Sequence, residues 1–144
     1  MGTSSDLRRR VCKILAYTSF AGLVTAGICF PIMAVLTHFH STGAMWIYML
    51  GPLGLMLGCI LYIAGVIYAH YALGWHFPRN FPAWTSRFLV AYWISNVALQ
   101  ILQYYLLKEG LLLLSAQVLS ATYPFILALA PYQTILRPLA AKSP

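Results

Sequence analysis

The chain has 144 residues, of which 61% are hydrophobic and 8% are charged, and its formal net charge is +7. Globular proteins average about 25% charged residues, so this composition excludes a water-soluble globular domain and indicates an integral membrane protein. The cations lie beside apolar segments, which argues against nucleic acid as a partner and favours a role in membrane orientation.

Four apolar segments are long enough to cross the hydrocarbon core, which takes about 20 helical residues. In chain order they are residues 14–37, 44–69, 88–107 and 111–130. Their apolar runs are continuous rather than alternating, which predicts helices instead of the strands of a β-barrel. The sequence therefore predicts an all-α integral membrane protein with one four-span domain over residues 1–144 and short loops.

The first segment, residues 14–37, follows a basic tract of Arg8, Arg9, Arg10 and Lys13. An Arg-rich, acid-poor start is typical of the positive flank of a membrane helix, and also of the start of a mitochondrial transit peptide. Within the segment, Gly22, Ala26 and Cys29 lie at helical spacing and form one face of small residues.

The second segment carries a stripe of small residues. This small-residue stripe consists of Ala44, Gly51, Gly54, Gly58, Gly65 and Ala72. All but Gly54 recur every seven positions, which is nearly two helical turns, so they lie in one row. Helices in lipid associate through close van der Waals contact, which small residues permit. The stripe predicts a groove for the first segment, for a helix of another subunit, or for a flat cofactor.

The third segment has a polar face made of Tyr92, Asn96, Gln100 and Gln103, at spacings of four, four and three. An amide without a hydrogen bond in hydrocarbon costs several kcal/mol, so this face is expected to meet protein or a polar headgroup. One interpretation is hydrogen bonding with the fourth segment, at Ser115, Ser120 or Tyr123. The other is a site for a quinone or a lipid headgroup.

The fourth segment follows the third after a turn that contains "KEG", which predicts an antiparallel hairpin. With four spans, the two tails and the second loop lie on one side of the membrane, and they hold eight of the nine Lys and Arg residues. The first loop and the third turn lie on the other side and hold only Lys108. The positive-inside rule then puts both termini inside.

No Asp, Glu, Lys, Arg or His falls well inside any predicted span. Proton pumps and ion-coupled transporters usually need such groups. The only acidic residues, Asp6 and Glu109, are peripheral, so no pair of carboxylates is available for acid–base catalysis. We therefore expect no catalytic residues, no metal site and no enzymatic activity of the chain's own.

Haem ligation is a further hypothesis, in which His38, His40 or His70 supplies one ligand and a partner chain supplies the other. These histidines lie at the ends of predicted spans, so the simpler interpretation is that each anchors its helix at the membrane surface. No cofactor is expected, although bound lipids are, and the quinone and haem hypotheses stay open.

The sequence favours a non-catalytic accessory subunit of a larger membrane complex, with other membrane subunits and lipids as its partners. A respiratory-type assembly of the mitochondrial inner membrane is the favoured setting. The alternative function is a quinone- or haem-binding membrane anchor of a redox complex. A third is a small homo-oligomeric transporter or lipid-handling protein.

Overall fold

The computed structural model describes residues 3–39, 45–75, 83–105 and 110–141, and every element in these ranges is helical. Two long helices come first, α1 (Thr3–His38) and α2 (Met45–Leu73). A third stretch of helix runs from Leu112 to Ala141. These three are long and apolar enough to cross a membrane, which fits a multi-pass membrane protein.

The helix α3 (Ala83–Tyr105) covers most of the predicted third span, 88–107, but does not belong with those three by length and apolarity. The amides of Asn96, Gln100 and Gln103 explain this, because they lower its mean hydropathy. The last two residues of that predicted span, 106 and 107, lie outside the described residues.

The last stretch of helix extends past Ala130, where the predicted fourth span ends. It comprises α4 (Leu111–Ser120), α5 (Tyr123–Pro131), a π-helical turn η1 (Tyr132–Leu136) and α6 (Arg137–Ala141). The apolar run weakens after Ala130, but prolines end a helix only where the freed backbone groups find no other partner. Here the π-helical turn after Pro131 carries the helix onward.

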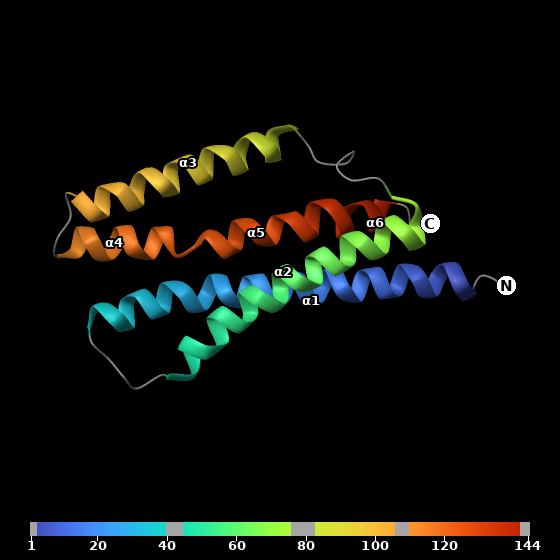
Figure 1. Ribbon diagram of the computed structural model, residues 1–144, viewed down its shortest axis with the longest axis horizontal. Helices are drawn as coiled ribbons and strands as arrows, with labels where there is room; N and C mark the ends of the chain where they lie inside the picture. Colours follow the sequence, from blue (N-terminus) through green and yellow to red (C-terminus); the bar gives the residue numbers. More distant parts are fainter. Residues whose placement is uncertain (1–2, 40–44, 76–82, 106–109, 142–144) are drawn as a thin grey trace.

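The arrangement centres on α1 (Figure 1), which packs against α2 most extensively and also against α5, α4 and η1. The helix α3 lies outermost and packs substantially against α4 alone among the described elements. The start of α1 and the end of α6 lie at the same end of the bundle.

Large apolar side chains cover the outside of the bundle, and small residues fill its inside. On α2, for example, Met49, Met56 and Ile63 are exposed whereas Gly51 and Gly58 are buried. Soluble monomers rarely expose apolar patches of this extent. The distribution fits a protein whose helices are surrounded by lipid and held together by close backbone approach.

One buried apolar cluster joins the first helix to the last. Its members are Cys12, Ala16, Ala69, Ile135, Leu136 and Leu139. They come from α1, from the end of α2, and from η1 and α6, so the start and the end of the chain close the same part of the bundle.

Candidate functional site

The small-residue stripe of α2 faces α1 along most of its length. Four of its members, Gly51, Gly54, Gly58 and Gly65, are buried, and Ala72 is half-buried. The remaining member, Ala44, lies outside the described residues.

Helices α1 and α2 meet backbone to backbone at Gly22 and Gly54. A Cβ atom added to Gly54 would lie 2.8 Å from the carbonyl oxygen of Gly22, and one added to Gly22 would lie 2.9 Å from that of Gly54. Real Cβ atoms essentially never come this close to another atom. Backbone therefore meets backbone at this crossing, and both positions need glycine.

The rest of the stripe meets side chains of the same chain. A Cβ atom at Gly51 would lie 3.1 Å from the sulfur of Met33 and 3.2 Å from Cβ of Cys29. At Gly65 the nearest atoms would be Cδ1 of Ile135, at 3.2 Å, and Cβ of Leu15, at 3.6 Å. Helix α1 and the turn η1 thus lie against the four glycines of the stripe, for which the sequence also allowed a partner helix or a flat cofactor.

A buried hydroxyl adds to the contact between α1 and α2, which we call the seam. Ser19 Oγ donates to the carbonyl oxygen of Gly58 over 2.6 Å, and Ser19 is fully buried. By contrast, the hydroxyls of Thr18 and Thr25 bond to carbonyls of their own helix, four residues back. The interhelical bond of Ser19 therefore fixes which face of α1 meets α2.

The polar face of α3 meets the hairpin partner where the partner helix is interrupted. Asn96 is buried, and its Nδ2 donates to the backbone carbonyl oxygen of Ser120 over 3.2 Å. In an unbroken helix that oxygen would accept from the N–H of residue 124, but residue 124 is a proline and has none. Asn96 thus supplies the missing donor.

The break itself is closed by local hydrogen bonds. The hydroxyl of Ser120 donates to the carbonyl of Gln117 and that of Thr122 to the carbonyl of Leu119. The amide of Gln100 donates to Oδ1 of Asn96 over 3.0 Å and holds the asparagine in place. The carbonyls of Gln117 and Leu119 thereby accept a hydroxyl as well as a backbone N–H.

Two groups of the polar face have no hydrogen-bond partner among the described residues. They are the hydroxyl of Tyr92 and Nε2 of Gln103, and both atoms are buried. Acyl chains cannot accept or donate hydrogen bonds. These two groups mark the places where the polar face is incomplete within the described part of this chain.

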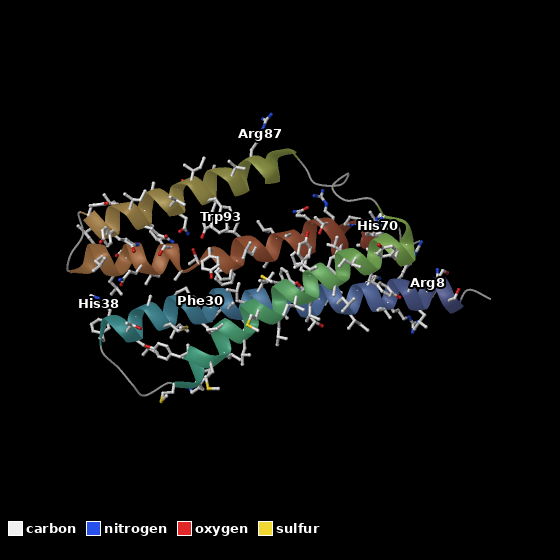
Figure 2. The ribbon with its side chains drawn as sticks, viewed as in Figure 1. Arg8, Phe30, His38, His70, Arg87 and Trp93 are labelled. Atoms are coloured by element: carbon white, nitrogen blue, oxygen red, sulfur yellow. The ribbon has the colours of Figure 1, made fainter. Side chains whose placement is uncertain are left out.

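Aromatic rings connect α3 to the rest of the bundle. The ring of Tyr123 stacks on Phe30 of α1, with centroids 5.9 Å apart, and lies 6.5 Å from the ring of Trp93 of α3. Figure 2 shows Trp93 pointing from α3 toward α5. On the neighbouring turn, the ring of Phe125 fills the space beside Gly27.

The histidines proposed as haem ligands do not come together. Figure 2 shows His38 and His70 at opposite ends of the bundle, so they cannot share one haem. The hypothesis of one ligand from this chain and one from a partner chain stays a prediction. Nδ1 of His70 lies 3.0 Å from the carbonyl oxygen of Trp75, which requires the proton on Nδ1. His40 lies outside the described residues. Within those residues, no three His, Cys, Asp or Glu side chains are grouped closely enough to hold a metal ion.

A further polar cluster, which sequence reasoning missed, lies at η1. The hydroxyls of Tyr62 and Thr134 are 3.2 Å apart, and Thr134 also donates to the carbonyl of Ala130. Nη1 of Arg137 donates to Oε1 of Gln133 over 3.0 Å. The one available signal was the pair Pro131 and Pro138, which predicts an irregular helix in between.

The described geometry thus contains a seam of backbone contact, a repaired helix break and an incomplete polar face, all of which concern helix association. Comparisons of the chain with family models, with curated proteins and with solved structures found no match.

Proposed function

We propose that this chain is a non-catalytic accessory subunit of a larger membrane complex, whose helices pack against helices of other subunits. The setting we propose is a respiratory-type assembly of the mitochondrial inner membrane, on the basis of the Arg-rich, acid-poor start of the chain. We further propose four spans with both termini on the cation-rich side.

The observation that carries this proposal is that α3 has few contacts with the described part of its own chain and an incomplete polar face. Its contacts with its own chain are concentrated on α4, and its polar face holds the buried, unpartnered hydroxyl of Tyr92 and amide of Gln103. A helix with these polar groups is poorly stabilised by lipid alone. Both atoms are covered by this chain's own atoms, so a neighbouring protein helix would complete the face once these side chains turn outward on assembly.

Purification in mild detergent, followed by mass spectrometry of the proteins that remain bound, tests the proposal. We expect defined membrane partners at fixed stoichiometry. We also expect a variant with Asn96→Leu, Gln100→Leu and Gln103→Leu to insert normally and to lose part of those partners. The subunit function would be refuted if the chain purified alone and the triple leucine variant had the same thermal stability as the unsubstituted chain.

The four-span topology has its own test. Tags at the two termini should be equally accessible to protease in sealed vesicles, because an even number of spans returns the chain to the side where it began. Opposite accessibility would mean that α3 does not cross the membrane.

A quinone-binding anchor is the second candidate. The buried hydroxyl of Tyr92 on α3 favours it, because Trp93 on α3 and Tyr123 on α5 supply aromatic rings for a flat ligand. The two functions differ in the triple leucine variant. An accessory subunit loses turnover in proportion to assembly, whereas a quinone site loses turnover per assembled complex. A Soret band in the purified chain would instead indicate the haem form of the anchor.

A further inference from the structure

Cations gather at one end of the bundle, where the chain begins and ends. Four of them, Arg8, Arg9, Arg10 and Lys13, lie on the first turns of α1. Arg137 lies at the start of α6, whose Leu139 packs in one cluster with Cys12 of α1. These five cations are the basic end.

Carboxylates are too few to neutralise the basic end. Within residues 3–39, 45–75, 83–105 and 110–141, Asp6 is the one acidic side chain. The remaining positive charge needs counter-charges from outside the described chain. Guanidinium groups bind phosphate through paired hydrogen bonds, which makes them suited to phosphodiester headgroups.

The first turns of α1 present both an apolar and a cationic surface on one face. Leu7, Arg10 and Ile14 follow helical spacings of three and four, and Leu7 and Ile14 are 62% and 63% exposed. Exposed apolar side chains on both sides of an exposed arginine fit the boundary between headgroups and acyl chains. Soluble anions would gain nothing from the apolar neighbours.

The other face of the same turns is closed by protein. Cys12 and Ala16 are fully buried in the cluster that includes Leu139, and Arg9 and Lys13, on either side of Cys12, are half-buried. At the beginning of α6, the buried amide of Gln133 accepts from Arg137 and holds its guanidinium in one orientation. Packing therefore fixes the position of the helices that carry the cations.

We infer that the basic end binds the phosphate headgroup of an anionic phospholipid, whose acyl chains lie along Ile14 and the apolar residues that follow it on α1, with Leu7 among the headgroups. This site does not depend on the proposed subunit function, because every group in it belongs to this chain. Each cation near an anionic surface contributes about a fivefold gain in affinity.

The test is thermal unfolding of the full-length protein in detergent, titrated with an anionic phospholipid or with a zwitterionic one that has the same acyl chains. We expect the melting temperature to rise with the anionic lipid alone. Native mass spectrometry should show that lipid retained. An equal rise with the zwitterionic lipid would overturn the inference, and so would an equal rise with inorganic phosphate at the same concentration.

Variants separate headgroup recognition from general charge. Joint substitution of Arg8→Gln, Arg9→Gln and Arg10→Gln should weaken the anionic lipid about 100-fold. The matching lysine substitutions keep the charge but not the paired hydrogen bonds, so they should restore only part of the lost affinity. Arg87→Gln, on α3 and outside the basic end, should leave the lipid response unchanged. A full response in the joint Arg8, Arg9 and Arg10 glutamine variant, with its topology and fold intact, would contradict the site.

Discussion

Asn96 of α3 donates to the carbonyl oxygen of Ser120, which is the oxygen that Pro124 leaves without its helical donor. A side chain from one helix thus replaces a backbone hydrogen bond in the next. The interrupted stretch between α4 and α5 is stable in apolar surroundings because α3 lies beside it. The polar residue and the proline are parts of one arrangement, although they are 28 positions apart.

A double-mutant cycle tests this relationship. Asn96→Leu alone should lower the free energy of unfolding by about 0.6–2 kcal/mol, the range for hydrogen bonds between membrane helices. In a Pro124→Ala background the backbone N–H is restored, so the same substitution should cost clearly less. Reversible unfolding in mixed micelles measures both values. Equal costs in the two backgrounds would show that Asn96 and Pro124 act independently.

The seam between α1 and α2 is tested by Gly54→Ala. The added methyl group meets the carbonyl oxygen of Gly22, which is backbone and cannot rotate away. We expect a loss of about 1–3 kcal/mol, as for overpacked cores, measured by unfolding in the same micelles. At Gly65 the nearest atom is the end of the flexible Ile135 side chain, so Gly65→Ala should cost less. The reverse order would contradict the described crossing.

A larger substitution should break the seam altogether. A leucine at position 58 would need space that Leu23 Cγ already fills, at 2.7 Å from the first added atom. We expect Gly58→Leu to abolish the assembled species on blue-native gels. Leu57→Ala is the matched control, because Leu57 is 53% exposed, and should assemble normally. Normal assembly of Gly58→Leu would show that assembly does not require close packing of α1 against α2.

The hydroxyl of Ser19 should contribute measurably to stability. It is buried and bonds across the seam to Gly58, so Ser19→Ala should cost about 1 kcal/mol. Thr18→Val removes a hydroxyl that bonds only within its own helix and should cost little. Chemical denaturation of the two variants side by side gives the comparison, and equal losses would mean that the interhelical bond carries no special weight.

The cover of Cys12 can be probed by thiol labelling. Cys12 is fully buried beneath the end of the chain, so a variant that keeps Cys12 alone should react slowly with a maleimide reagent. Leu139→Ala leaves a cavity over the cluster and should accelerate labelling several-fold. The matched control is Leu119→Ala, because Leu119 is 62% exposed and outside the cluster. Fast labelling without any substitution would contradict the described packing.

Much of the fold is predictable from the sequence because hydropathy is averaged over many residues. The long apolar helices α1 and α2 and the helical stretch from Leu112 agree with predicted segments. The extension to Ala141 was missed, since it depends on η1, which packs Ile135 and Leu136 against Cys12. Contacts between distant residues determine whether a helix continues beyond its apolar run, and no local pattern reveals them.

The candidate site was predictable to a different degree. Spacing alone places Asn96 and Gln100 on one face, because helical periodicity is fixed. Which atom Asn96 would bond was not predictable, since the acceptor is a backbone carbonyl created by Pro124 rather than a side chain. Similarly, the spacing of the glycines predicts a groove, but only the three-dimensional arrangement places Gly54 against Gly22.

The cluster that joins Cys12 to Leu139 has a consequence for biosynthesis. Leu139 is synthesised after Cys12, and at about 5–20 residues per second the interval is roughly 6–25 s. Until then the small-residue face of Cys12 and Ala16 lacks its cover, however well α1 and α2 have already paired. Folding at this end of the bundle therefore waits until η1 and α6 have been synthesised, and a chain truncated before Ile135 would keep that face uncovered throughout its lifetime.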